Sequence, residues 1–230
     1  SYDNFEELSN FATKHNLWFH IDGAHGGGVV FSDKYKYLAK GIHKADSITI
    51  DFHKMLMTPA PSTALIFKNE KYSYDNFQQQ AHYIWDSQES KEWYNSGKRT
   101  FECTKLMMSI KVYAILKTYG EKIFEENIDY LFDLTHSFAK LIISRDTFEL
   151  ALAPQSNIIN FRYVKAKKAV LDNLNSNIRQ ILVESGKFYI VQTMIDSKRY
   201  LRCTVMNPLT KITDFEALLD EIEIIAQRHK

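Results

Sequence analysis

Residues 47–56 read SITIDFHKML, in which four residues of alternating polarity are followed by an acid, an aromatic residue, a histidine and a lysine. Period-two alternation predicts a strand over residues 47–50, because successive side chains of a strand point to opposite faces. Lys54 therefore lies just past the end of a predicted strand, beside apolar neighbours. Desolvation among such neighbours favours the neutral amine, so Lys54 is a candidate nucleophile.

A second strand is predicted upstream, at residues 17–21 (LWFHI), and Asp22 follows it directly. The next stretch, DGAHGGG at residues 22–28, holds four glycines, which predicts a loop whose backbone approaches another group closely. Helical spacing before the first strand, and helical turns between the two strands, complete a helix-strand-loop-helix-strand order. This order is typical of an α/β fold with a mostly parallel sheet.

Helical spacing resumes at about residue 101 and runs to Tyr119, and a second helix is predicted from Glu121. Before these helices, a third strand is predicted at residues 63–68 (TALIFK), and a long polar and aromatic excursion follows it. From about residue 147 the pattern changes to that of a small α+β domain. Its predicted strands lie within residues 148–153, 157–163, 188–194 and 199–205, and its amphipathic helix spans residues 169–186.

The composition excludes several classes of partner. Basic and acidic residues number 29 and 28, a net charge of +1, without a basic run or an acidic tail, so neither nucleic acid nor a membrane surface is expected as a partner. Cys103 and Cys203 have no paired spacing, which fits a reduced compartment and predicts a cytoplasmic protein. Because the chain begins at Ser1 rather than methionine, we expect that a leader or a longer segment has been removed.

Asp22 and Lys54 follow two neighbouring predicted strands, at the edge where ligands gather in α/β sheets. A carboxylate there needs a cation or hydrogen-bond donors, so the two side chains either form an ion pair or hold the two ends of one cofactor. Pyridoxal 5′-phosphate has two such ends, because its aldehyde binds a lysine and its protonated ring nitrogen needs a carboxylate. His20 and His25 flank Asp22 but lack further ligands, so no metal is expected.

Two motifs, taken as a pair at their separation, resemble those of the group II pyridoxal-phosphate-dependent amino acid decarboxylases. They are WFHIDGAHGG at residues 18–27 and ADSITIDFHKML at residues 45–56. Within the family, the motif sequences look most like those of the L-2,4-diaminobutyrate decarboxylase branch. The similarity continues through AHYIWD (81–86), SGKRTFECTK (96–105) and YLRCTVMNP (200–208).

The resemblance implies a cofactor role for four residues near the strand ends. Lys54 would form the Schiff base with pyridoxal 5′-phosphate, and Asp22 would pair with the ring nitrogen. Ala24 would pack against the ring, and His53 would lie by the phosphate. Asp51 departs from the family, because many members have asparagine there, and it places a negative charge near the expected phosphate.

Three more distant residues are assigned by the same resemblance. Tyr83 matches a loop tyrosine that protonates the α-carbon after carbon dioxide leaves, and Gly97 matches a region near the dimer interface and the partner's phosphate. Arg202 matches an arginine that holds a substrate carboxylate in glutamate decarboxylases. Period-two alternation puts Arg202 on the opposite face of its strand from Leu201 and Cys203, so it need not be buried in the core.

The fold implied is the carboxy-terminal part of a fold-type I, aspartate aminotransferase-like enzyme, with a mostly parallel sheet and a small α+β C-terminal domain. Residues 1–120 would belong to the large cofactor-binding domain, residues 121–146 to a linking helix and residues 147–230 to the small domain. The family's amino-terminal half, with its phosphate loop, would lie upstream of Ser1. We therefore expect either a homodimer or pairing with a missing N-terminal segment.

The activity implied is decarboxylation of an L-amino acid to a primary amine, with a diamino acid such as 2,4-diaminobutyrate as the substrate. Decarboxylation of glutamate, aspartate or an aromatic amino acid stays open, because the resemblance does not fix the substrate side chain. Another lyase or a transaminase with the same cofactor uses lysine and aspartate in the same way. The alternative that is not an enzyme is a non-catalytic fragment that lacks the N-terminal half.

Overall fold

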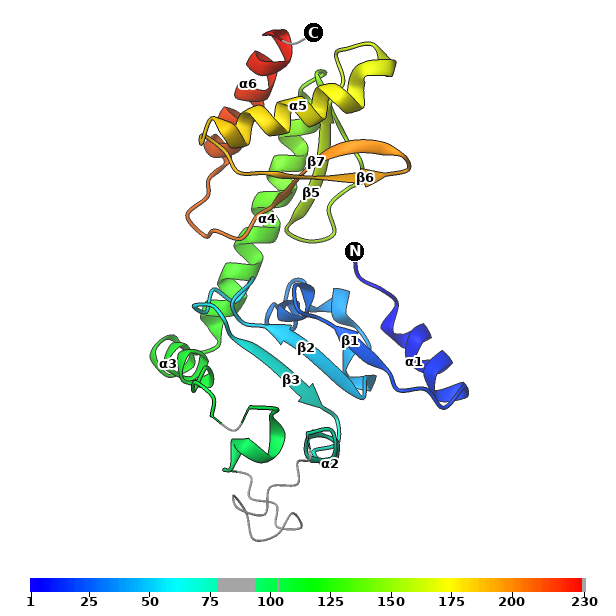
Figure 1. Ribbon diagram of the computed structural model, residues 1–230, viewed down its shortest axis with the longest axis vertical. Coiled ribbons are helices and arrows are strands. Elements are labelled where there is room, and N and C mark those ends of the chain that lie inside the picture. Colours follow the sequence, from blue (N-terminus) through cyan, green and yellow to red (C-terminus); the bar gives the residue numbers. More distant parts are fainter. Residues whose placement is uncertain (78–93, 103, 229–230) are drawn as a thin grey trace. The chain divides into compact units, whose positions relative to one another are not determined.

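The computed structural model describes residues 1–77, 94–102 and 104–228 (Figure 1). The chain divides into two compact units, each described here by itself. The first unit comprises residues 3–124, and the second comprises residues 125–230 together with Ser1 and Tyr2. The division of the chain at residues 120 and 146 stays a prediction.

A three-stranded sheet forms the centre of the first unit. Its strand order is β1-β2-β3, with β1 (His20–Asp22) parallel to β2 (Ser47–Asp51) and β2 antiparallel to β3 (Thr63–Phe67). The helix α1 (Phe5–Lys14) precedes β1 in the chain. The three strands predicted from residues 17–68 are confirmed, and the sheet holds one parallel and one antiparallel pairing.

Short helical turns connect the strands of the first unit. The 3₁₀ helix η1 (Gly26–Phe31) follows β1, and η2 (Lys36–Ala39) and η3 (Ile42–Lys44) lead into β2. The prediction of a loop over residues 22–28 is therefore correct only up to His25. The reason is tertiary: a Cβ on Gly27 would lie 2.9 Å from Cγ1 of Ile50, so the glycine lets η1 lie directly against β2.

Among the described residues between β3 and α4, the chain forms α2 (Lys71–Asp75), η4 (Ser96–Arg99) and α3 (Ser109–Tyr119). The helix predicted from about residue 101 thus begins eight residues later, at Ser109. Leu106 and Met107, which precede the helix, are both more than two-thirds exposed. No residue of α3 is buried.

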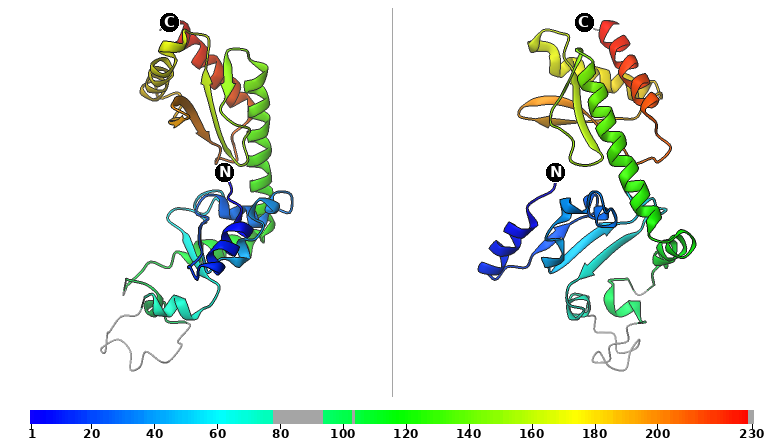
Figure 2. Two further views of the ribbon diagram at one scale, coloured as in Figure 1. Left: turned by 90° about the vertical axis from the view of Figure 1, so that its right-hand side faces the viewer. Right: turned by 180° about the vertical axis from the view of Figure 1, so that it is seen from behind.

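The second unit is built on a four-stranded antiparallel sheet with the order β4-β5-β7-β6. Its strands are β4 (Phe148–Leu150), β5 (Ile158–Tyr163), β6 (Val191–Ile195) and β7 (Lys198–Thr204). The helices of this unit lie beside the sheet (Figure 2). They are α4 (Lys122–Ser144), α5 (Leu171–Glu184), preceded by η5 (Lys168–Val170), and α6 (Ile212–Arg228).

The core of the second unit lies between these helices and one face of the sheet. Ile159 and Phe161 of β5 and Leu201 of β7 belong to one buried cluster with residues from α4, α5 and α6. Phe138 of α4 stacks on Phe215 of α6 with a centroid distance of 3.9 Å. The strands and the two helices predicted for this part of the chain are confirmed. Within the residues that the structure describes, no helix is both long enough and apolar enough to cross a membrane.

Candidate active site

The turn after β2 presents Lys54. The chain leaves the strand at Asp51, and the Phe52 N–H donates to the carbonyl of Ser62, which closes the loop back onto β3. Met55 and Leu56 are 1% exposed, and they fix the turn to the core of the first unit. The Lys54 side chain is one-third exposed. Its place just after β2 is the one that the alternation over residues 47–50 predicts.

The ammonium of Lys54 contacts the carboxylate of Asp51. Nζ lies 2.8 Å from Oδ2, and the Thr63 hydroxyl donates to Oδ1 of the same carboxylate at 2.6 Å. Burial acts to raise the pKa of Asp51, but the hydrogen bonds from Lys54 and Thr63, with the charge on Lys54, hold that pKa below its ordinary value. Asp51 is therefore ionised at neutral pH, with both of its oxygens engaged.

Asp22 ends β1 at the same edge of the sheet. Its backbone pairs with Thr49 of β2, and its exposed carboxylate accepts a hydrogen bond from the Ala24 N–H at 3.0 Å. The carbonyl of Ala24 in turn accepts from the Asp51 N–H at 3.2 Å, which joins the turn after β1 to the end of β2. Over the described ranges Asp22 forms no ion pair, so an Asp22–Lys54 ion pair is wrong: Lys54 binds Asp51.

His53 is oriented by the backbone of the same loop. Its Nδ1 lies 3.1 Å from the Ser62 nitrogen and 2.9 Å from the Ser62 oxygen. This contact turns Nε2 toward Asp51, 3.8 Å from Oδ2. His53 therefore lies near the oxygen of Asp51 that Lys54 contacts, beyond hydrogen-bond distance.

Glycine backbone lines the turn between Asp22 and β2. A Cβ on Gly23 would lie only 2.8 Å from the carbonyl oxygen of Thr49 and 3.1 Å from Cα of Gly27. The backbone at Gly23 consequently lies directly against the end of β2. An amine, a carboxylate and a flat backbone surface at one sheet edge are the groups that pyridoxal phosphate requires, so the residues present fit this cofactor.

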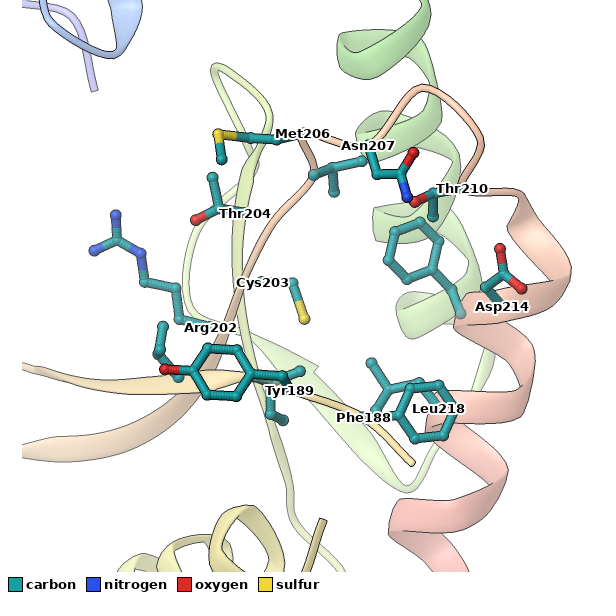
Figure 3. A pocket seen from close by; sticks show the side chains of 14 residues that line it. Phe188, Tyr189, Arg202, Cys203, Thr204, Met206, Asn207, Thr210, Asp214 and Leu218 are labelled. Atoms are coloured by element: carbon teal, nitrogen blue, oxygen red, sulfur yellow. The ribbon is translucent and has the colours of Figure 1, made fainter. Parts of the chain in front are cut away.

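The remaining predicted site residues lie elsewhere. Gly97 lies in η4 of the first unit, where its N–H donates to the side chain of Asn95. Tyr83 falls in residues 78–93, outside the described part of the chain. Arg202 lies in β7 of the second unit and lines a cavity of about 640 Å³ (Figure 3). Within the first unit, the structure places Lys54 and Asp22 at one edge of the sheet and Gly97 in η4. Arg202 belongs to the second unit.

The cavity beside Arg202 is mainly apolar inside. Figure 3 shows Cys203, Phe188 and Leu218 around its interior, with the Arg202 guanidinium at one side and Asp214 at the other. Arg202 is half-buried, whereas Leu201 and Cys203 point into the core, as the period-two alternation predicts. The guanidinium is thus presented on the face of the sheet away from the helices.

Sequence reasoning missed the part played by Asp51 and Thr63. The sequence shows Asp51 as a departure from the family, and its i,i+3 spacing to Lys54 across a turn is the pattern that indicates an ion pair between them. The contribution of Thr63 depends on the antiparallel pairing of β2 with β3, which sets Thr63 opposite Asp51. That register becomes visible only in the folded chain.

The sequence profile of the pyridoxal-dependent decarboxylase conserved domain matches residues 1–164. The chain belongs to this family. Pyridoxal-dependent decarboxylases are carboxy-lyases, so the predictions of the family and of its cofactor, pyridoxal 5′-phosphate, are confirmed.

Two curated relatives and one solved structure illustrate the family's range. The chain is 26% identical over 229 residues to aromatic-L-amino-acid decarboxylase of Bacillus atrophaeus, covering 98% of this chain and 48% of the relative. It is 31% identical over 249 residues to aspartate 1-decarboxylase of Aliivibrio fischeri, covering 98% and 45%. The solved structure is the glutamate decarboxylase domain of diaminobutyrate-pyruvate transaminase and L-2,4-diaminobutyrate decarboxylase from Vibrio parahaemolyticus, with 28% identity, a TM-score of 0.82 and coverage of 99% and 44%.

This likeness confirms the predicted α/β, fold-type I class. The chain spans about half the length of the curated relatives it matches. Those relatives act on different amino acids, so the family membership of the chain leaves its substrate open.

Proposed function

We propose that the chain carries the lysine-bearing part of a pyridoxal-phosphate-dependent decarboxylase that converts an L-amino acid to a primary amine. The observation that carries the proposal is the placement of the Lys54 amine and the Asp22 carboxylate at one edge of the sheet, after parallel strands β1 and β2. Lys54 would bind the cofactor aldehyde. Bound pyridoxal phosphate supplies an electron sink for the loss of carbon dioxide.

The neighbouring residues would hold and orient the cofactor. Asp22 would keep a proton on the ring nitrogen, for which its exposed carboxylate has a free oxygen besides the Oδ1 that accepts from Ala24. Ala24, at the glycine-lined turn, would support the ring, and His53 would lie by the phosphate. Lys54 would return to the cofactor after each turnover.

Three roles extend this site beyond the sheet edge. Tyr83 would donate the proton that replaces carbon dioxide on the α-carbon. Arg202 would bind a substrate carboxylate, for which its guanidinium geometry is well suited. Gly97 would contribute to cofactor binding near the dimer interface.

For the substrate we propose a diamino acid such as 2,4-diaminobutyrate. The motif sequences and the likeness to the Vibrio parahaemolyticus decarboxylase domain support this choice. Aspartate is the second candidate, because the Aliivibrio fischeri relative is an aspartate 1-decarboxylase and Arg202 offers a cation to a second carboxylate. Glutamate and aromatic amino acids complete the set to be tested, and a lyase or transaminase reaction would be distinguished by its products.

We propose further that the chain works in a cytoplasmic assembly, as a homodimer or paired with an N-terminal segment of its own protein. Support comes from the apolar surface at α3, where none of the helix's residues is buried. Several exposed large apolar residues close together in sequence are a feature of protein interfaces. Here they are Leu106, Met107, Ile110, Tyr113, Leu116 and Tyr119.

Product analysis tests the proposed reaction. The chain, alone and joined to the rest of its polypeptide, would be incubated with pyridoxal phosphate and each candidate amino acid, and carbon dioxide and amine would be measured. Equimolar carbon dioxide and primary amine, lost in Lys54→Arg, would support decarboxylation. An aldehyde or a keto acid in place of the amine would point to another lyase or a transaminase, and no product from any form would favour a non-catalytic fragment.

A further inference from the structure

The Asp51 carboxylate is fixed before it meets Lys54. Backbone pairing with Thr63 holds Asp51 at the end of β2, and the Thr63 hydroxyl binds one carboxylate oxygen at 2.6 Å. The other oxygen is directed at Lys54, 2.8 Å from Nζ. The Asp51 side chain is only 11% exposed, so water screens this pair less than it screens a surface ion pair.

The turn keeps the Lys54 amine within reach of the Asp51 carboxylate. Its neighbours Met55 and Leu56 are buried and fix the turn to the core, and Nζ contacts Oδ2 of Asp51. Removal of the carboxylate would release Nζ from this contact.

The other titratable groups near this pair are few in the part of the chain that the structure describes. His53 lies 3.8 Å from Asp51 on the same turn. Asp22, at the end of β1, is exposed and bound to the Ala24 N–H. Lys111 of α3 donates to the carbonyl oxygens of Pro59 and Ala60 in the same loop. Asp51 is therefore the carboxylate in direct contact with Lys54.

We propose that the ion pair with Asp51 occupies Nζ of Lys54 and thereby slows its condensation with an aldehyde until the pair separates. In the condensation, the ammonium first gives a proton to solvent. The neutral Nζ then attacks the aldehyde carbon, a C=N bond forms and the carbonyl oxygen leaves as water. Asp51 acts through Lys54 and is a positioning residue. Only the identity of the natural aldehyde, pyridoxal phosphate, rests on the proposed function.

Reductive methylation tests this proposal without any cofactor. The chain and its Asp51→Asn variant would be treated with formaldehyde and cyanoborohydride between about pH 6 and about pH 9, and methylation of Lys54 would be followed by peptide mass. We expect labelling of Lys54 to be about tenfold faster in the variant at neutral pH, because Nζ no longer has to leave a charge-assisted hydrogen bond before it reacts. Equal rates in the two folded proteins would overturn the proposal.

Asp33 provides a matched control. It forms the same i,i+3 contact with Lys36 at 2.6 Å, but both side chains are more than half exposed. We expect Asp33→Asn to change labelling of Lys36 less than twofold and to leave Lys54 unaffected, because exposed pairs interact weakly. A tenfold rise at Lys36 would assign the effect to any Asp–Lys pair and overturn the special role of Asp51.

A second variant covers the case in which Asp51→Asn does not fold. Thr63→Val keeps the carboxylate but removes the hydroxyl that fixes it, so labelling of Lys54 should rise by about two- to threefold. An unchanged rate would contradict the proposal.

Borohydride trapping of pyridoxal phosphate, measured separately, tests the proposed function. If Lys54 carries the adduct but the methylation rates are equal, the proposed function stands and the inference about Asp51 fails. If Lys54 carries no adduct but is methylated faster in the variant, the inference stands and the proposed function fails.

Discussion

Nζ of Lys54 lies 2.8 Å from Oδ2 of Asp51, three residues before it, across the turn that ends β2. The same carboxylate accepts from Thr63 at the start of β3, so a single acid joins the lysine to two strands. This contact makes Asp51 part of the structure around Lys54 as well as an influence on its reactivity.

Acid should weaken the fold through Asp51. Because the folded-state pKa of Asp51 is lowered, its contribution to stability is complete above its unfolded pKa of about 3.9 and is lost as the pH falls through the lower folded value. We expect the difference in unfolding free energy between the chain and Asp51→Asn to be constant above about pH 5 and to shrink below about pH 4. Urea unfolding across this pH range measures it, and a difference that stays constant into strong acid would contradict the assignment.

Lys54→Arg should separate cofactor binding from stability. Lys54 is one-third exposed, and arginine keeps a cation for Asp51, so the unfolding free energy should change by less than about 1 kcal/mol. The variant should nevertheless form no Schiff base, because a guanidinium does not act as the required amine. Urea unfolding and the visible spectrum after addition of pyridoxal phosphate give the two results, and a stable variant that keeps the cofactor band would exclude Lys54.

Gly23→Ala should destabilise the first unit more than Gly28→Ala. The new Cβ at Gly23 would lie 2.8 Å from the backbone oxygen of Thr49, which cannot move without disturbing the β1–β2 pairing. At Gly28 the nearest atom is 3.2 Å away, in the flexible side chain of Leu56. We expect Gly23→Ala to lower the unfolding free energy by about 1–3 kcal/mol in urea unfolding, and Gly28→Ala to lower it less. The reverse order would contradict the close approach of Gly23 to Thr49.

The Cys203 thiol should be inert in the folded chain. It is buried in the core of the second unit, and burial raises its pKa to about 12. We expect iodoacetamide at about pH 8 to modify Cys203 at least tenfold more slowly in buffer than in urea. Peptide mass measures this residue alone, and equal rates in buffer and urea would show that the second unit is open.

Much of the fold could be predicted from local pattern. The alternation in residues 47–50 gives β2 and the position of Lys54 after it, and the alternation around Arg202 gives the buried and open faces of β7. The helix from Glu121 and the amphipathic helix before Gly186 also follow from their periodicity. These elements have an apolar face that packs against a core, so their pattern and their packing agree.

The parts that could not be predicted depend on contacts distant in sequence. The contact of Gly27 with Ile50 is one of them, because the glycine-rich composition predicts a close approach without naming its partner. The helix expected from residue 101 begins at Ser109. The hydroxyl that fixes the Asp51 carboxylate is another, since strand pairing sets Thr63 opposite Asp51, whereas the i,i+3 contact of Asp51 with Lys54 is local. Tyr83 lies outside the described residues, so its role stays a prediction.

The measurement that tests the central claim most directly is the location of a trapped cofactor. The chain would be mixed with pyridoxal phosphate, reduced with borohydride and digested, and the modified residue would be found by peptide mass, with Lys68 and Lys36 as exposed reference lysines. Our account predicts a reduced adduct at Lys54, formed at far lower cofactor concentration than at the reference residues and lost in Lys54→Arg. Modification of Lys54 no greater than that of the reference lysines, in the chain joined to the rest of its polypeptide, would contradict it.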